Sequence, residues 1–116
     1  MTVTLVTLLK RRPGMSQKEF RDYYERYHRL IGEDVLAPYA VRYVRRYLTP
    51  LDGEDRDCDF DVVMEIDFPD EATMARFFES TSDPQISQRI AKDEAMLFDT
   101  NRIRSFRLDR EAMSAL

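Results

Sequence analysis

Residues 16–31, SQKEFRDYYERYHRLI, constrain the fold of this chain more than any other stretch, because they carry a complete helix signal. Ser16 can cap the helix, and Glu19, three residues later, can bond back to the cap. The following aromatic and apolar side chains recur at helical spacing and form one stripe: Phe20, Tyr23, Tyr24, Tyr27 and Ile31. His28, the only histidine, lies at the edge of this stripe. The stretch therefore predicts an amphipathic helix with a titratable group beside its buried face.

The composition predicts a single acidic domain over residues 1–116. Its 22 acidic and 18 basic residues give a net charge of −4 and are well mixed, so no basic field suits the chain to nucleic acid. One cysteine, Cys58, excludes an internal disulfide, and one cysteine with one histidine cannot form a zinc site of thiolate and imidazole ligands. The N-terminal apolar run precedes its charges, unlike a signal peptide, and is too short to cross a membrane. We therefore expect a cytoplasmic protein.

Strand and helix signals alternate along the whole chain. Apolar or alternating runs predict strands at residues 2–10, 39–48, 60–68 and 102–108. Helix signals predict a first helix ending near Gly32, a second after Pro69-Asp70, and an extra short helix from Asp83-Pro84 to about Phe98. The acidic segment LTPLDGEDRDCD lacks periodicity and predicts a loop between the second and third strands. This order indicates an α+β, ferredoxin-like βαββαβ fold with an extra short helix and a four-stranded antiparallel sheet.

Both faces of the predicted sheet carry residues that need partners: charged residues on one strand pair and apolar residues on both sides of the central strands. A hairpin of the second and third strands would place Arg42 and Arg46 opposite Glu65 and Asp61. The first and third strands carry apolar residues on both parities, so a single layer of helices cannot cover all of their apolar surface. A second copy of the chain would cover the bare face most simply. We therefore predict a homodimer that packs sheet against sheet.

Two segments resemble the signatures of the EthD family of dimeric α/β-barrel proteins. The first is LLKRRPGMSQKEFRDYYERYH, residues 8–28, and the second is EAMLFDTNRIRSFRLD, residues 94–109. The chain departs from the usual pattern in having Leu30 in place of a proline and Tyr24 in place of a tryptophan. The resemblance implies a ferredoxin-like protomer, a homodimer, and a pocket between sheet and helices for a small aromatic or polyketide-like molecule.

His28 is the first candidate for chemistry, because an imidazole can take and give a proton near neutral pH. It falls on the motif histidine of the family that the chain resembles; the alternative is a buried histidine with a structural hydrogen bond. Asp99 is the second candidate, as the carboxylate that orients the imidazole or as a second acid or base. Its alternative role is a cap or an ion pair with Arg102 or Arg104. Tyr24 is a candidate for hydrogen bonding to a substrate carbonyl or enolate, or a core residue.

A further set of residues is predicted to line a substrate pocket; the alternative is packing in the core for the aromatic residues, and structural pairing with Asp99 or the acidic loop for the arginine. These residues are Tyr27, Tyr43, Tyr47, Phe77 and Arg104. We expect neither a metal nor a cofactor.

The resemblance and the candidate residues together favour a cofactor-independent lyase or cyclase of the dehydratase or decarboxylase type. The first alternative is a non-catalytic binding or accessory protein of a degradation pathway. The second is cofactor-free oxygenation of a phenolic substrate. Haem binding is a weaker idea that rests on kinship with other families of the same superfamily.

Overall fold

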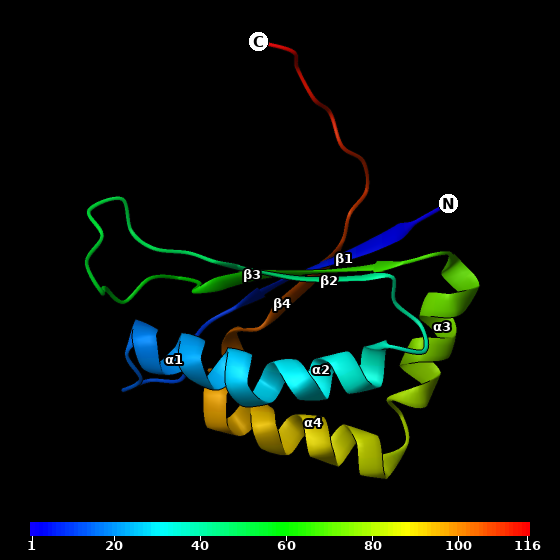
Figure 1. Cartoon of the computed structure of the whole chain (residues 1–116), viewed down its shortest axis with the longest axis horizontal. Helices are drawn as coiled ribbons and strands as arrows, with labels where there is room; N and C mark the ends of the chain where they lie inside the picture. The colour runs from blue at the N-terminus through cyan, green and yellow to red at the C-terminus, as the bar shows by residue number, and fades with distance from the viewer.

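The computed structural model describes residues 1–116 and contains one four-stranded antiparallel sheet (Figure 1). The strands are β1 Val3–Leu9, β2 Arg42–Tyr47, β3 Val62–Phe68 and β4 Arg104–Arg107, in the spatial order β2-β3-β1-β4. The helices are α1 Gln17–Tyr23, a π-helical segment η1 Tyr24–His28, α2 Arg29–Leu36, α3 Glu71–Ser80, α4 Pro84–Leu97 and a 3₁₀ turn η2 Thr100–Arg102. The ferredoxin-like βαββαβ prediction is confirmed, and the sheet remains open rather than closing into a barrel within one chain.

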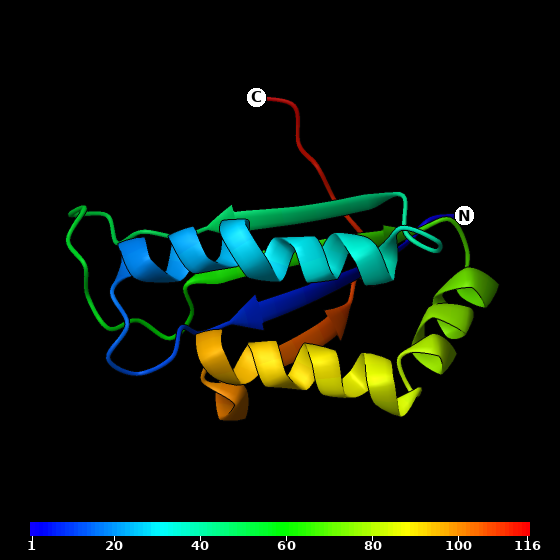
Figure 2. The same ribbon diagram turned by 60° about the horizontal axis from the view of Figure 1, so that its bottom comes forward.

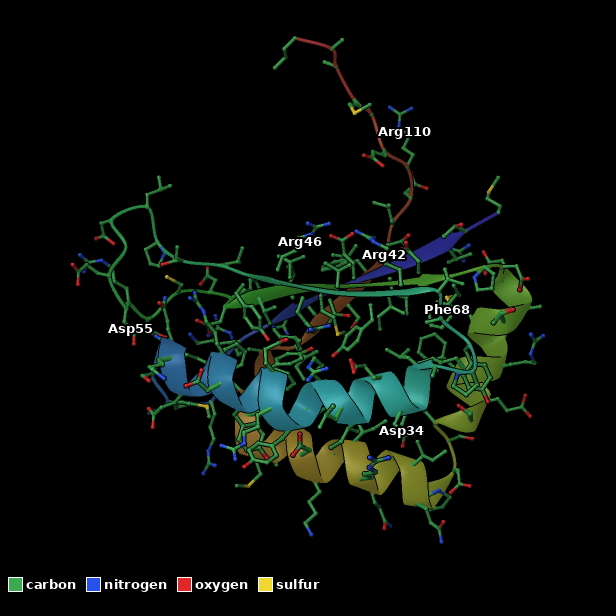
Figure 3. All side chains as sticks on the ribbon, viewed as in Figure 1. Asp34, Arg42, Arg46, Asp55, Phe68 and Arg110 are labelled. Atoms are coloured by element: carbon green, nitrogen blue, oxygen red, sulfur yellow. The ribbon has the colours of Figure 1, made fainter.

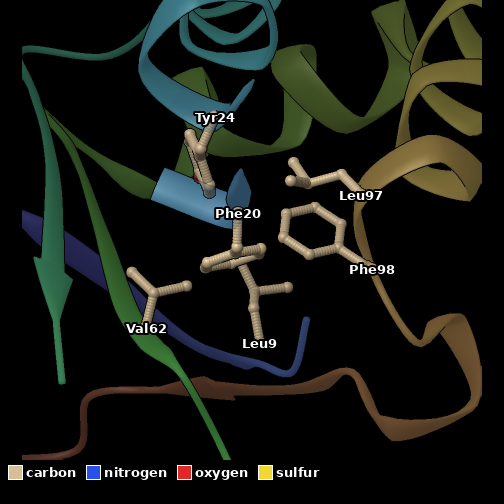
Figure 4. Close-up of a cluster of buried hydrophobic side chains, with 6 residues drawn as sticks. All are labelled: Leu9, Phe20, Tyr24, Val62, Leu97 and Phe98. Atoms are coloured by element: carbon tan, nitrogen blue, oxygen red, sulfur yellow. The ribbon is translucent and has the colours of Figure 1, made fainter. Parts of the chain in front are cut away.

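All the helices lie on one face of the sheet (Figure 1). Figure 2 shows the continuous rod α1–η1–α2 running beside α4, with α3 at one end. The main core cluster, shown in Figure 4, joins the sheet to both helical segments and contains Leu9, Phe20, Tyr24, Val62, Leu97 and Phe98. A second cluster, nearer α3, contains Leu36, Ile66, Phe68 and Phe77.

The first helix extends beyond its predicted end at Gly32 to Leu36. Gly32 therefore lies inside the helix and does not end it. A Cβ atom at this position would lie 2.8 Å from the phenol oxygen of Tyr43. Close packing against β2 therefore explains the glycine better than a helix stop does. Leu36 continues the apolar stripe and is buried.

Helix α4, Pro84–Leu97, has the predicted bounds, but its description as an extra short helix is wrong. It has 14 residues against 10 in α3, so it is a main layer-forming helix and not a short accessory one. Asp83 caps it by accepting a hydrogen bond from the Gln85 N–H, and Pro84 occupies its first turn, as the sequence predicts.

The predicted β2–β3 hairpin forms, and Arg42 and Arg46 both pair with Glu65, while Arg42 also pairs with Asp67, which the sequence did not predict. Arg46 Nε lies 2.7 Å from Glu65 Oε2, and Arg42 Nη1 lies 3.2 Å from Asp67 Oδ2. Asp61 does not take part, which corrects the predicted pairing. Its side chain lies under the end of β1, where Oδ2 accepts a hydrogen bond from the backbone N–H of Arg11 at 2.8 Å.

The sheet face opposite the helices, called the open face below, is covered by no other part of the chain (Figures 1 and 3). Strand register places these side chains on it: Thr4, Val6, Leu8, Arg42, Val44, Arg46, Val63, Glu65, Asp67, Arg104 and Phe106. Phe106 is 55% exposed. Apolar residues on both faces of the central strands are therefore a property of the structure, as the sequence predicts.

None of the helices is both long enough and apolar enough to cross a membrane.

Candidate functional site

The rod that carries His28 contains a π-helical turn at Tyr24–His28. Its signature is the N–H of Arg29, which donates to the carbonyl oxygen of Tyr24, five residues earlier. Such turns are rare and occur often at functional sites. Tyr24 and His28 are the buried residues of this turn, and their rings meet edge to face with centroids 5.1 Å apart. The regular helical spacing of the sequence gives no sign of this irregularity.

His28 forms a hydrogen-bonded pair with Asp93 of α4. Its side chain is almost fully buried, and Nδ1 lies 2.8 Å from Asp93 Oδ2. An ionised carboxylate can only accept hydrogen bonds, so Nδ1 carries the proton and donates it. The same logic leaves a lone pair on Nε2, for which the protein supplies no hydrogen-bond partner. The Phe98 ring packs edge to face against the imidazole, with centroids 5.2 Å apart.

Asp93 receives a second hydrogen bond from the rod. The Tyr23 hydroxyl donates to Asp93 Oδ1 at 2.6 Å, so each carboxylate oxygen has its own donor. Burial, together with the hydrogen bond to Asp93, raises the pKa of Tyr23 to about 12, so its hydroxyl stays protonated. The carboxylate is therefore held in place from two positions on the rod, and it fixes the orientation of the imidazole.

The environment keeps the imidazole neutral. Burial lowers the pKa of His28 from 6.5, and the hydrogen bond and negative charge of Asp93 oppose this effect only in part. The side chain of the next residue, Glu94, has no hydrogen bond or ion pair, and burial followed by repulsion from Asp93 raises its pKa. At neutral pH the site thus presents a neutral imidazole whose free nitrogen is a base.

A family model described as the EthD domain matches residues 12–101. The chain belongs to the EthD family. No curated protein sequence matches it. The resemblance found in the two sequence segments is thereby confirmed, and His28 lies inside the matched range.

Solved structures share the EthD-like fold at low sequence identity. An EthD family protein from Bacillus halodurans is 13% identical with a TM-score of 0.66, covering 96% of this chain and 100% of that chain. A dimeric protein of ferredoxin-like fold from Bacteroides fragilis is 13% identical with a TM-score of 0.60, covering 92% and 94%. SnoaB, a cofactor-independent oxygenase from Streptomyces nogalater, is 16% identical with a TM-score of 0.56, covering 97% and 95%. These likenesses show the fold of the family.

Asp99 is not the carboxylate that pairs with His28. Its side chain instead accepts a hydrogen bond from the Asn101 N–H and caps η2, and its own N–H donates to Lys10 at the end of β1. The predicted pairing with His28 is therefore wrong, and the alternative role as a cap is confirmed. Asp93 was missed although a signal exists, because it lies three residues after Ile90 and four before Leu97, on the inward side of α4.

Tyr24 lies next to His28, as predicted, but has no exposed surface. Its hydroxyl is 2.9 Å from that of Tyr43 and 3.4 Å from the sulfur of Met64. Burial raises the pKa of Tyr24 well above 10. The geometry matches the core alternative, and a direct contact between Tyr24 and substrate stays a prediction.

The other predicted lining residues do not converge on His28. Tyr47 donates a hydrogen bond to Glu25, which also pairs with Arg45 at 2.7 Å. Tyr27 is half exposed and packs on Tyr23 with ring centroids 5.0 Å apart. Phe77 belongs to the second core cluster, near α3.

Arg104 lies on the open face, in register with Leu8. The layer of the sheet therefore separates it from His28, so Arg104 does not line a site around the imidazole, and its contact with a substrate stays a prediction. Its Nη1 donates only to the backbone oxygens of Asn101 and Ile103. Which face Arg104 occupies depends on the register of β4 against β1. The sequence predicted the strand but not this register.

His28 lies outside the main hollows of the surface. No group of three or more histidine, cysteine, aspartate or glutamate side chains is placed to hold a metal ion. Five surface hollows, of about 200 to 520 Å³, do not include His28. Nε2 makes no hydrogen bond and is not among the fully buried atoms that lack one, so it keeps some contact with the surface outside these hollows.

Proposed function

We propose that this protein is a small-molecule enzyme in which Nε2 of His28 acts as the general base and then as the general acid. The favoured reaction is a cofactor-independent dehydration, decarboxylation or cyclisation of an aromatic or polyketide-like substrate. The observation that carries the proposal is the buried His28–Asp93 pair, with Nδ1 bonded to the carboxylate and Nε2 free.

The pair supplies both halves of a proton transfer. Nε2 takes a proton from a carbon next to a substrate carbonyl, which leaves an enolate and an imidazolium. The Asp93 carboxylate, 2.8 Å from Nδ1, stabilises that imidazolium. In a dehydration the imidazolium then gives the proton to the departing hydroxyl group, and water leaves. Tyr23 holds Asp93 in position throughout, through its hydrogen bond to the other carboxylate oxygen.

The surroundings favour an aromatic substrate. The rings of Tyr24 and Phe98 flank the imidazole, and a flat ring can replace one of their contacts more readily than a charged group can. Exclusion of water by these rings strengthens the interaction between the imidazolium and Asp93.

The test does not require the natural substrate. The protein is incubated in D₂O with a panel of aromatic β-hydroxy ketones, and mass spectrometry follows deuterium uptake next to the carbonyl and loss of water. The change His28→Gln should lower the rate by about 100-fold or more, because general acid–base catalysis contributes about 10²–10⁴-fold. Asp22→Asn, on the exposed side of α1, is the matched control and should leave the rate unchanged. An equal rate in His28→Gln contradicts the proposal.

A second candidate is cofactor-free oxygenation of a phenolic substrate. It is supported by the shared fold of SnoaB, a cofactor-independent oxygenase, and by the imidazole base, which could deprotonate a phenol. Oxygen consumption with a phenolic probe and no added flavin or metal distinguishes it from lyase chemistry. A probe that binds and is returned unchanged would instead favour a non-catalytic binding protein.

We also propose that the protein is a homodimer that packs through the open face. The exposed Phe106 and the half-buried Val6 and Val63 support this assembly, because a second copy would remove their apolar surface from water. The Bacteroides fragilis protein of the same fold is dimeric. Light scattering at micromolar concentration tests the assembly, and a monomeric mass contradicts it.

A further inference from the structure

The last eight residues, 109–116, form what we call the C-terminal arm, which leaves the body of the protein altogether. The last hydrogen bond of β4 runs from the Leu108 N–H to the Thr4 oxygen, and no residue of the arm makes a hydrogen bond or an ion pair. Figures 1 and 3 show the arm rising from the sheet on the side opposite the helices, with Arg110 near its base. The arm therefore projects into the space that a second copy would occupy.

The arm carries apolar side chains with nothing to cover them. Met113 is 90% exposed and Leu116 is fully exposed. An extended segment of eight residues reaches up to about 28 Å, whereas a four-stranded sheet is only about 19 Å wide. The arm is therefore long enough to cross the sheet of a neighbouring molecule.

The open face is small compared with a stable protein interface. Its strands have four to seven residues, so their footprint is roughly 400 Å² for spacings of about 4.8 Å between strands and about 3.3 Å along them. A stable interface buries about 800 Å² on each partner. The projected footprint of the open face is about half of this accessible area, so contacts from elsewhere in the chain would enlarge the interface.

The charges of the open face and of the arm also support contact between two copies. Arg104 on the open face has only backbone oxygens as partners, whereas Arg42 and Arg46 are paired with carboxylates of β3. The arm carries two carboxylates without partners, Asp109 and Glu111. An arm lying across the open face of another copy brings these opposite charges together.

We propose that in the dimer each C-terminal arm crosses to the other protomer, where Met113 and Leu116 pack on its apolar surface. The proposal rests on the homodimer proposed above and adds that the arm, not only the sheet, holds the two copies together. The exchange is reciprocal, because a two-fold axis makes both copies equivalent.

Sedimentation equilibrium of three proteins tests the contribution of the arm. A chain ending at Leu108, and the double change Met113→Ser with Leu116→Ser, should each raise the dimer dissociation constant at least about tenfold relative to the full chain. The double change Ala112→Ser with Ala115→Ser keeps the two large side chains and should leave the constant within about threefold. Thermal unfolding checks that the body of the protein is unaffected, since the arm makes no hydrogen bond to it.

The outcomes separate the arm from the dimer itself. If the full chain and the chain ending at Leu108 dimerise equally, the arm proposal is overturned and the homodimer stands. If the full chain is a monomer, both fall.

A cross-link shows where the arm lies. A photoreactive phenylalanine analogue replaces Met113, and equal amounts of ¹⁵N-labelled and unlabelled chains are mixed before irradiation. Cross-linked peptides that combine one labelled and one unlabelled partner are expected. Cross-links formed only within a single chain would overturn the exchange.

Discussion

The two faces of the sheet are built from the same strands but differ in how their apolar side chains are covered. On the helix face, Leu9 and Val62 pack against Phe20 and Leu97, and little apolar surface remains. On the open face, Phe106 stays half exposed, and pairs such as Arg46 with Glu65 are its main internal contacts. The homodimer proposed above would resolve this difference, because a second copy would cover the open face as the helices cover the other.

The His28–Asp93 pair lies on the helix face of the sheet. Burial there lowers the pKa of His28 and makes the orientation by Asp93 effective, whereas an exposed imidazole would be screened by water. Only one buried side-chain N or O atom, Nη1 of Arg11, lacks a hydrogen bond, and it lies 2.5 Å from a carboxylate oxygen of Asp55. Nε2 of His28 also lacks a hydrogen bond but is not fully buried, so it is the nitrogen that the proposed function makes available to a ligand.

The largest contrast between the two faces should come from aromatic truncation. Phe20→Ala removes a ring from the main core cluster and should lower the free energy of unfolding by about 3–5 kcal/mol. Phe106→Ala removes a ring of similar size from the open face and should cost the isolated protomer less than about 1 kcal/mol. Urea unfolding at concentrations below the dimer dissociation constant measures both. Equal losses would contradict the distinction between the faces.

A smaller effect is expected at Gly32. In an ordinary helix interior, glycine to alanine gains about 1 kcal/mol. Here Gly32→Ala should instead lower the free energy of unfolding by about 1–3 kcal/mol, because the new Cβ lies 2.8 Å from the Tyr43 oxygen. Thermal unfolding of this variant decides the sign, and a stabilised protein would show that the rod does not pack tightly on β2.

The dependence of stability on pH tests the burial of His28. Its pKa is lowered in the folded protein, so below about pH 6.5 the unfolded chain binds the proton more readily. The free energy of unfolding should therefore fall as the pH drops below 6.5, and this contribution should be absent in His28→Gln. Glu94 has a raised pKa and acts in the opposite direction, but it is present in both proteins and cancels in their difference. Denaturant curves at pH 7.5 and 5.5 measure the effect, and parallel pH dependences would contradict it.

The smallest effect should come from the charges of the open face. Arg46→Gln removes a largely exposed ion pair with Glu65 and should change the free energy of unfolding by at most about 1 kcal/mol. Unfolding at low and high salt measures it. A loss above 2 kcal/mol in the protomer would mean that this face is not solvated as described.

Local patterns were sufficient for the fold but not for the site. The cap at Ser16, the alternation along residues 62–68 and the caps at Asp70 and Asp83 depend on neighbouring residues and were readable in the sequence. The partner of His28 lies 65 residues away, on another helix, and its choice depends on how α4 is rotated. Asp93 and Asp99 differ by six residues, and only the packed structure shows that the chain has left the helix before Asp99.

The sequence also did not predict the π-helical turn or the register of β4, which sets the face that Arg104 occupies. The turn replaces ordinary i to i+4 bonds without changing the spacing of the aromatic stripe. The strand that holds Arg104 has four residues, too few for alternation to fix which side chains face the helices.

The central claim is that His28 is a neutral imidazole with its proton on Nδ1, held by Asp93, and a free Nε2. Because the chain has a single histidine, ¹⁵N NMR of histidine-labelled protein across pH 5–8 reports on this group alone. We expect a protonated Nδ1, an unprotonated Nε2 at pH 7 and a pKa below 6.5, with Asp93→Asn removing the preference for the Nδ1–H form. A pKa at or above 6.5, or a proton on Nε2 in the neutral ring, would contradict the account.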